Sequence, residues 1–294
     1  MPLTVDGNNP IEAPSMPPSP LISTHWLQDN LENDRVVPID ASWHMPATGR
    51  IGADEFKESL IPGALFFDID TIVDATSQLP HTMPTEESFE KAIRALGISN
   101  DDTIIVYDKG DIPTAARAWW MFRAMGHENV YMLDGGFSKW QQEKRPITNT
   151  LSTREPSMFK ATFNATLFRD IDAVCTNLKT KQALVIDARS KGRFDGTVPE
   201  PRSGLRSGHI PNSINLPFDT LYKADGTLKE IAELKEIIAN APIDLSKQIT
   251  TSCGSGVTAC NLAIAFAALG KWDVAVYDGS WTEWGGNPKL PIQL

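Results

Sequence analysis

Short runs of apolar residues alternate along the chain with segments that have helical periodicity. In the second half, the apolar runs are Ala183–Ala188, Ser213–Phe218, Gln248–Cys253 and Asp273–Asp278. These runs are continuous, which is typical of parallel strands that helices cover on both faces. Helical patterns occupy Leu228–Asn240 and Val257–Leu269, and the second stops at Gly270, a residue that commonly ends helices. Strands and helices in alternation predict an α/β fold with a doubly wound, mainly parallel sheet.

The same pattern occurs twice. The segment Val37–Ser42 (VPIDAS) resembles Val185–Ser190 (VIDARS), and Val130–Gly136 (VYMLDGG) resembles Val274–Ser280 (VAVYDGS). The aligned pairs Asp40 and Asp187, Asp108 and Cys253, and Asp134 and Asp278 are separated by 147, 145 and 144 residues. A nearly constant offset over separate matches indicates a tandem duplication. We therefore expect two α/β domains of similar size, each with helices on both faces of a parallel sheet.

Composition divides the chain into four segments. Six prolines lie within residues 1–20, which we expect to form a disordered tail. The first domain is expected at 21–149 and the second at 165–294. Between them, residues 150–164 are polar and contain Pro156, so they are predicted to be the linker.

Charge and hydropathy limit the partners of the protein. The chain has 27 Lys and Arg against 37 Asp and Glu, and this net charge of −10 disfavours nucleic acid and anionic membranes as partners. The most apolar stretch, Leu262–Leu269, is far shorter than the roughly 20 residues that cross a bilayer. No Lys or Arg precedes Arg35, unlike in secretory signals and mitochondrial presequences. We expect a cytoplasmic protein.

The segment Cys253–Ala259 (CGSGVTA) has the strongest chemical signal in the chain. It lies between a predicted strand and a predicted helix, and parallel α/β sheets bind ligands at the carboxyl ends of their strands. Its two glycines allow several backbone N–H groups to converge, and the following helix adds the positive end of its dipole. A thiolate is stabilised in such a place, so Cys253 is predicted to be a nucleophile.

The neighbouring residues limit the chemistry of this cysteine. A phosphatase loop of the Cys-x5-Arg kind needs an arginine six residues after the nucleophile, and that position is Ala259. A disulfide oxidoreductase needs Cys-x-x-Cys, but the next cysteine is Cys260. Three cysteines, with Cys175 as the third, are too few for a disulfide framework or a four-thiolate zinc site. Cys175 and Cys260 are expected to pack as small core residues.

Several motifs together resemble a known family. They are Cys253–Ala259 in the second copy alone, Ser207–Pro211 (SGHIP), Tyr277–Trp284 (YDGSWTEW), Gly192–Phe194 (GRF) and Pro199–Arg202 (PEPR). A tandem pair of α/β copies with these motifs resembles the two-domain rhodanese superfamily over residues 21–290. The cysteine loop is similar to that of the 3-mercaptopyruvate sulfurtransferases in this superfamily. Relatives that use thiosulfate carry basic residues after the cysteine.

The resemblance implies a reaction and the residues that bind its donor. In this family the cysteine takes sulfur from a donor, becomes a persulfide and passes the sulfur to a thiol or cyanide. Here it implies 3-mercaptopyruvate as the donor, a persulfide on Cys253 and release of pyruvate. It assigns donor binding to Arg193, Arg202, Gly254, Gly256, Val257 and Thr258. Arg189 is expected to form a structural ion pair, while the role of Arg206 stays open.

The resemblance also implies a proton relay of an acid, a histidine and a serine, matched by Asp70, His81 and Ser255. Such a relay would take the proton of the donor thiol and protonate the enolate of pyruvate. It places the histidine in the first domain and Cys253 in the second, so we expect the active site between the domains. The first copy has Asp108 where the second has Cys253. A carboxylate cannot carry a persulfide, so the first copy is expected to be catalytically silent.

The remaining polar and aromatic candidates are expected to be structural. His209 has Leu60 as its counterpart in the first copy, so it is not assigned to the relay. Five tryptophans in or beside helical segments are expected to pack in the core: Trp119, Trp120, Trp140, Trp281 and Trp284.

Two other functions compete with the leading interpretation. A thiosulfate:cyanide sulfurtransferase would share the fold and the persulfide, but it would need a more cationic loop for a dianion. A non-catalytic sulfur carrier or redox sensor could use Cys253 for binding alone. The expected acceptor is a thiol such as thioredoxin or a small thiol. No metal or cofactor is expected, because the sequence has neither a metal cluster nor a nucleotide fingerprint.

Overall fold

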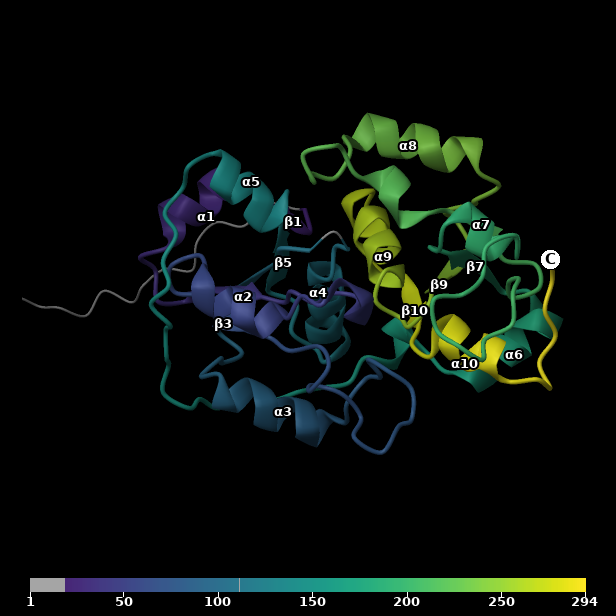
Figure 1. Ribbon diagram of the computed structural model, residues 1–294, viewed down its shortest axis with the longest axis horizontal. Coiled ribbons are helices and arrows are strands. Elements are labelled where there is room, and N and C mark those ends of the chain that lie inside the picture. Colours follow the sequence, from purple (N-terminus) through teal and green to yellow (C-terminus); the bar gives the residue numbers. More distant parts are fainter. Residues whose placement is uncertain (1–18, 111) are drawn as a thin grey trace, which may run out of the picture.

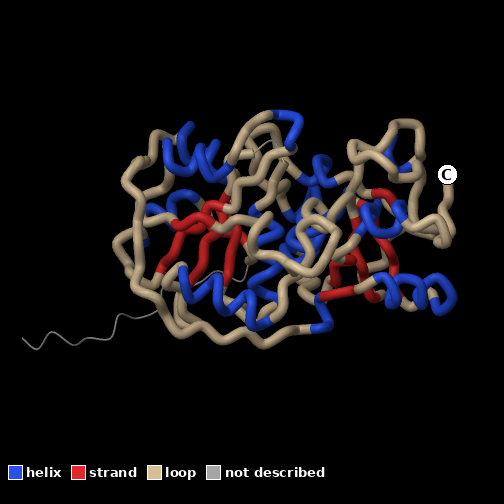
Figure 2. Tube along the Cα trace, turned by 60° about the horizontal axis from the view of Figure 1, so that its bottom comes forward, coloured by secondary structure: helices blue, strands red, loops and turns tan. Residues whose placement is uncertain are grey.

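A computed structural model describes residues 19–110 and 112–294, which form two α/β domains. Figure 1 shows them side by side, the first in purple to teal and the second in green to yellow. In Figure 2 each domain contains its own group of strands, enclosed by helices and loops. This arrangement confirms the predicted α/β duplication. The tail predicted at 1–20 lies outside the described residues, apart from positions 19 and 20.

The first domain is built on a five-stranded parallel sheet in the order β1-β5-β4-β2-β3. Its strands are β1 (Leu21–Ile22), β2 (Val36–Asp40), β3 (Leu65–Phe66), β4 (Thr103–Tyr107) and β5 (Val130–Leu133). Its helices are α1 (Thr24–Asn30), η1 (Pro46–Thr48), α2 (Gly52–Glu58), α3 (Glu86–Ala95), α4 (Ala115–Ala124) and α5 (Gly136–Gln142).

The second domain repeats this topology with the order β6-β10-β9-β7-β8, again with parallel pairing throughout. Its strands are β6 (Phe168–Arg169), β7 (Ala183–Asp187), β8 (Ile214–Asn215), β9 (Gln248–Ser252) and β10 (Ala275–Tyr277). Its helices are η2 (Ala165–Leu167), α6 (Ile171–Thr180), α7 (Lys191–Phe194), η3 (Phe218–Leu221), α8 (Ile231–Asn240), α9 (Ala259–Ala268) and α10 (Ser280–Gly286).

The buried strands explain why the apolar runs are continuous. In β4, Ile104 and Val106 pack in one hydrophobic cluster, whereas Ile105 and Tyr107 pack in a second cluster on the opposite face. Residues of α1, α2 and α5 join the second cluster, and residues of α3 and α4 join the first. Because both faces of the sheet are covered by helices, every residue of the strand must be apolar or hydrogen-bonded.

Some predicted elements differ from the structure at their ends. The helix expected at Leu228–Asn240 begins at Ile231, because Glu230 and Glu233 form a capping box that starts α8 there. The helix expected to begin at Val257 begins at Ala259, and the two residues before it remain in the cysteine loop. The strand expected at Ser213–Phe218 is only the two residues of β8. A short edge strand with Pro217 two residues after it cannot extend the ladder.

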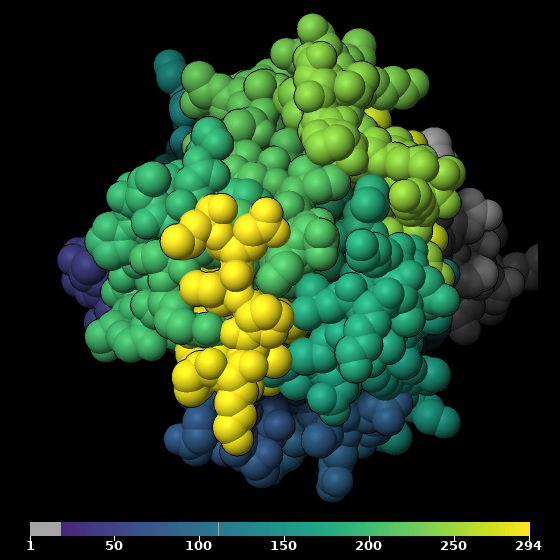
Figure 3. Space-filling view, turned by 90° about the vertical axis from the view of Figure 1, so that its right-hand side faces the viewer, coloured from purple at the N-terminus to yellow at the C-terminus, as the bar shows by residue number. Residues whose placement is uncertain are grey.

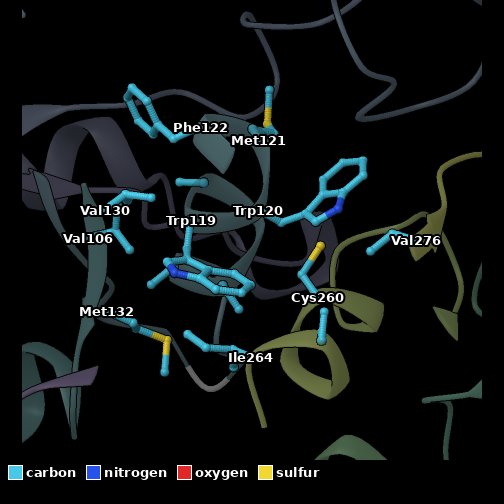
Figure 4. Packing of buried hydrophobic residues seen from close by; sticks show 14 of the residues in the cluster. Val106, Trp119, Trp120, Met121, Phe122, Val130, Met132, Cys260, Ile264 and Val276 are labelled. Atoms are coloured by element: carbon cyan, nitrogen blue, oxygen red, sulfur yellow. The ribbon is translucent and has the colours of Figure 1, made fainter. Parts of the chain in front are cut away.

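Helices α4 and α9 pack against each other between the two sheets and form the centre of the domain interface. Both helices are buried on almost all sides, which is the pattern of a helix enclosed within a core. In the close-up of Figure 4, Cys260 of α9 lies near Trp120 of α4, and Ile264 lies near Trp119. The hydrophobic cluster of α3 and α4 continues into α8 and α9, so the two domains share one core.

The connecting segment and the C-terminus are both fastened to the domains. Phe159 is fully buried against Phe89 and Phe122 of the first domain, and Arg154 donates to the carboxylate of Asp102. The C-terminal residues, yellow in Figure 3, lie across the surface of the second domain. The backbone of Gln293 forms two hydrogen bonds with the backbone of His209. Among the described residues, no helix is long and apolar enough to span a membrane.

Candidate active site

Cys253 follows β9 directly and begins the loop that leads into α9. Its side chain is buried, at 1% exposure. Both backbone groups of this residue are held by the start of α10: the N–H of Cys253 donates to Ser280 Oγ at 3.0 Å, and its carbonyl accepts from Trp281 N at 2.9 Å. The loop carbonyl of Gly254 accepts from Thr282 N at 2.8 Å. The cysteine is therefore fixed between a strand end and a helix start.

Gly256 allows the loop to turn back beneath the cysteine. Its φ of +76° lies in the left-handed region, which favours glycine. A Cβ atom here would lie 2.5 Å from the carbonyl oxygen of Asp278. The sequence requirement for glycine at this position is thus both conformational and steric.

Two arginines predicted from the resemblance lie over the loop. A Cβ atom on Gly254 would lie 3.1 Å from Arg193 Nη2 and 3.8 Å from Arg202 Nη1. The bare glycine lets both guanidinium groups approach the backbone beside Cys253. They and the loop enclose a small cavity of about 60 Å³ between the domains, which Trp43, Met45, Ile112, Pro201, Cys253, Ser255, Val257 and Thr258 also line.

The two arginines differ in how strongly they are already paired. Glu200 accepts from Arg193 Nη2 at 2.6 Å and from Arg189 Nη1 at 2.8 Å. Arg189 also binds Asp187 at 2.6 Å, which confirms its expected structural ion pair. Within the described chain, Arg202 makes neither a hydrogen bond nor an ion pair. Burial lowers the pKa of Arg202, but a guanidinium keeps its charge, so this side chain is available to an anion.

Asp70 and His81 lie together in the first domain, as the relay requires. His81 Nδ1 is 3.2 Å from Asp70 Oδ1, and Trp43 Nε1 donates to the other carboxylate oxygen at 2.8 Å. The Trp43 ring also contacts the His81 ring edge-on, with centroids 4.9 Å apart. A carboxylate accepts only from a protonated Nδ1, which leaves Nε2 as the basic nitrogen. Nε2 is buried and has no hydrogen-bond partner among the described residues.

His81 is neutral at physiological pH. Burial, followed by the positive charge of Arg117, lowers the pKa of His81 to about 4. Its φ of +58° is uncommon for a residue other than glycine, although histidine is among the side chains that tolerate it best. A loop histidine between prolines is usually exposed, but this ring is held inside the interface at 3% exposure. Its Nε2 is therefore unprotonated and open to a proton, although the lowered pKa makes the ring a weaker base than a free imidazole.

A buried ion pair joins the histidine segment to the cysteine loop. Arg117 of α4 binds Asp278 at 2.8 Å, and it also donates to the carbonyls of His81 and, at 3.3 Å, Gly256. Asp278 in turn accepts from the N–H of Met83 at 2.7 Å. Side chains from each domain thus hold backbone of the other. This ion pair fixes the position of His81 relative to the Cys253 loop.

The predicted site residues are therefore distributed over both sides of one interface. Cys253, Ser255, Val257, Thr258, Arg193 and Arg202 line the small cavity, with Gly254 beneath the guanidinium groups and Gly256 at the turn. Trp43 lines the same cavity and contacts both Asp70 and His81. Ser255 is buried in the loop, one residue before the carbonyl that Arg117 ties to the His81 segment.

The residues expected to be structural have structural contacts, and so does Arg206, whose role the sequence left open. Burial strongly raises the pKa of the Cys260 thiol, which donates to the Gly256 carbonyl at 3.2 Å. His209 stacks on Phe194 with ring centroids 3.7 Å apart, and Arg206 binds four carbonyls at the end of α10 and beyond it. The five tryptophans of the prediction are each at most 1% exposed. Cys175 is partly buried and packs beside the cluster of Val174, Tyr277 and Trp281.

In the first domain, the loop that corresponds to the Cys253 loop holds the carboxylate of Asp108. Asp108 Oδ2 accepts from the N–H of Ala115 at 2.8 Å, so a carboxylate lies where the second domain has a thiol. Burial raises the pKa of Asp108 to about 7. A larger cavity of about 530 Å³ lies beside this loop, with Tyr222, Lys223 and Gly226 on its far wall. Cavity size alone would therefore point to the loop of Asp108 and not to that of Cys253.

Four contributors to the site were not predicted from the sequence: Trp43, Arg117, Asp278 and Ser280. Arg117 and Trp43 have no local motif, because their partners come from distant segments. Ser280 did have a signal in the repeat, since its counterpart in the first copy is Gly136.

Comparison with known proteins identifies the family. The family model described as "Rhodanese-like domain" matches residues 23–143 and 171–287. The thiosulfate/3-mercaptopyruvate sulfurtransferase 1, mitochondrial, of Arabidopsis thaliana is 44% identical, over 93% of this chain and 78% of its own. The thiosulfate sulfurtransferase of Rattus norvegicus is also 44% identical, over 90% of this chain and 91% of its own.

A solved structure agrees with both sequence matches. The SseA structure from Escherichia coli, described under the rhodanese fold and catalytic mechanism of 3-mercaptopyruvate sulfotransferases, superposes with a TM-score of 0.82. It is 37% identical and covers 90% of this chain and 99% of its own. The chain belongs to the rhodanese family, as two tandem rhodanese-like domains. It is a sulfurtransferase.

Proposed function

We propose that the protein transfers sulfur from 3-mercaptopyruvate to a thiol acceptor through a persulfide on Cys253, with release of pyruvate. The observation that carries this proposal is the charge balance beside the cysteine. Three arginines, at 189, 193 and 202, are set against the two carboxylates of Asp187 and Glu200. One positive charge, on Arg202, is left for the donor.

A single available charge suits a monoanion. The carboxylate of 3-mercaptopyruvate carries one negative charge and can accept two parallel hydrogen bonds from a planar guanidinium. Thiosulfate is a dianion, and the loop residues after Cys253 up to Thr258 include no basic side chain. Asp70 acts on the same Arg202 across the interface and offsets part of its charge, so no positive charge is left for the second negative charge of a dianion. The relatives are named for both donors, so the choice between donors rests on this charge argument.

The reaction balances without an oxidant. The thiolate of Cys253 attacks the sulfur of the donor, an S–S bond forms, and the bond between that sulfur and carbon breaks. The electron pair of the broken bond stays on carbon, which leaves as the enolate of pyruvate. A thiolate acceptor then attacks the outer sulfur of the persulfide and restores the Cys253 thiolate.

The proposed relay carries the proton that these reaction steps displace. The S–H proton of the donor must leave sulfur, and the enolate carbon must gain one. Neutral His81, with its free Nε2 and with Asp70 on Nδ1, supplies a base for this transfer through the hydroxyl of Ser255. Asp70 holds the ring in the required tautomer, as the acid of a triad does.

The test is the intact mass of the purified protein after exposure to 3-mercaptopyruvate, to thiosulfate or to neither, together with pyruvate release. We expect a gain of one sulfur atom with 3-mercaptopyruvate, a weak gain with thiosulfate and none in Cys253→Ser. Cys260→Ser is the matched control, because that thiol is buried in the core, and it should still load. An equal or greater gain with thiosulfate would assign the protein to the thiosulfate reaction. No adduct with either donor would leave only a binding role.

A further inference from the structure

Ser280 has a backbone conformation that its side chain disfavours. Its φ is +50°, and its side chain is completely buried at the start of α10. A residue with a Cβ atom is disfavoured in the left-handed region, and such outliers persist where the surrounding structure enforces them. The hydroxyl makes two hydrogen bonds: it donates to the Tyr277 carbonyl at 2.7 Å and accepts from the N–H of Cys253 at 3.0 Å.

The duplicated domain supplies an internal comparison. Gly136 is the counterpart of Ser280, and its φ is +55°. Phe137 N donates to the Asp108 carbonyl at 3.0 Å, just as Trp281 N donates to the Cys253 carbonyl at 2.9 Å. The two turns thus share a left-handed residue and the hydrogen bond that follows it, but they differ one residue earlier, where φ is +82° at Gly135 and −67° at Gly279. The silent domain uses the residue that this backbone favours, and the domain with the nucleophile uses a serine.

This difference distinguishes the conformation that the turn requires from the hydrogen bond that the cysteine loop requires. If the turn required only a left-handed residue, glycine would serve in both domains without conformational strain. The serine retains that strain and adds a hydroxyl whose acceptor function is directed at the backbone of Cys253. In the first domain, a Cβ on Gly136 would lie 3.0 Å from the Asp108 carbonyl oxygen and 3.9 Å from Asp108 N, so a side chain would point toward the same backbone there, in a tight contact.

We infer that Ser280 is a positioning residue for the nucleophile: its hydroxyl fixes the backbone of Cys253 and thereby the direction of the Cβ–Sγ bond. The inference rests on the proposed function in that Cys253 is the residue that takes up sulfur. Ser280 itself touches neither donor nor acceptor.

The mechanism of positioning follows from the two hydrogen bonds to Cys253. Ser280 and Trp281 are consecutive, and they hold the N–H and the carbonyl of one residue. Asp278, two residues earlier, is bound to Arg117 and to Met83 N of the first domain. The turn therefore ties the cysteine to the domain that supplies His81. Without the hydroxyl, a buried N–H loses its acceptor, and the cysteine backbone shifts toward any substitute.

The experiment compares Ser280→Gly with Ser280→Ala in the full-length protein. Both variants lose the hydroxyl, but only glycine also relieves the strained φ. We measure the thermal midpoint of unfolding of each variant. We also measure the single-turnover rate at which Cys253 gains sulfur, from the intact mass of quenched samples, with whichever donor loads the wild-type protein. Steady-state kcat and KM are measured in parallel. Gly136→Ser is the matched control, because it places the strained serine in the silent domain.

Positioning predicts that the rate follows the hydroxyl and not the stability. We expect both Ser280 variants to lose on the order of tenfold in rate and in kcat, with KM little changed. Ser280→Gly should melt at a higher temperature than Ser280→Ala, and Gly136→Ser should keep the wild-type rate despite a changed midpoint. Rates that rise with the midpoint across these variants, or a wild-type rate in Ser280→Gly, would overturn the inference. A wild-type sulfur gain in Cys253→Ser would instead overturn the proposed function.

Discussion

The ion pair between Arg117 and Asp278 is the interaction whose removal should cost most at the domain interface. Arg117 is completely buried, and the side chain of Asp278 is 7% exposed. Replacing Arg117 with methionine leaves a buried carboxylate without its cation, which typically costs about 3–5 kcal/mol. The carbonyls of His81 and Gly256 lose their donor at the same time. A domain stability of about 5–15 kcal/mol would be reduced severely.

A double-mutant cycle separates the charge pair from the rest of the damage. Asp278→Asn keeps an acceptor for Met83 N but removes the negative charge. We expect Arg117→Met and Asp278→Asn each to destabilise the protein, and the double variant to be more stable than their sum by roughly 2 kcal/mol or more. Urea denaturation followed by tryptophan fluorescence gives the free energies. Activity should fall on the order of tenfold in Arg117→Met, because His81 loses its fixed place.

Strict additivity of the two substitutions would refute this reasoning, since it would mean that Asp278 does not depend on Arg117. Arg117→Lys provides a further control. It keeps the charge but cannot reach a carboxylate and two carbonyls with one ammonium group. We expect its stability to lie between those of the wild type and Arg117→Met.

Three further predictions follow from the site. Arg202→Met should raise KM for 3-mercaptopyruvate by about tenfold to a hundredfold, and Arg202→Lys should restore part of that loss; steady-state pyruvate release measures both, and an unchanged KM would remove Arg202 from the donor site. Because the pKa of His81 is lowered from 6.5 to about 4, the unfolded chain binds this proton first as the pH falls. Stability should therefore decline between pH 6.5 and about 4, by an amount of about 3 kcal/mol from this group, and His81→Gln should flatten the slope; an identical slope would contradict the assignment. The pKa of Asp108 is raised from 3.8 to about 7, so its contribution to stability is lost as the pH rises across that range. Asp108→Asn should increase the denaturation midpoint at pH 8 without changing sulfur transfer, and a drop in activity would give the first domain a chemical role.

The fold was largely readable from the chain because its signals are local or periodic. Continuous apolar runs mark strands that are buried on both faces, and the nearly constant offset between motifs marks the duplication. The ends of elements were less predictable. Helix α8 begins where Glu230 and Glu233 cap each other, and β8 is shortened where Pro217 follows. The ends of these elements depend on contacts between particular side chains, and the pattern of apolar residues does not contain that information.

For the site, the sequence by itself determined where the candidate nucleophile loop lies, since Cys253, its glycines and the strand-to-helix position are contiguous. Resemblance to a family added Arg193, Arg202 and the relay residues. Only the tertiary structure decided which arginine is available, because the pairing of Arg193 with Glu200 depends on side-chain contacts across the loop. It also revealed Arg117 and Asp278, whose partners lie across the domain interface, and Ser280, whose partner is the backbone of Cys253. Such contacts join residues that are up to 195 positions apart, a separation that leaves no periodic trace along the chain.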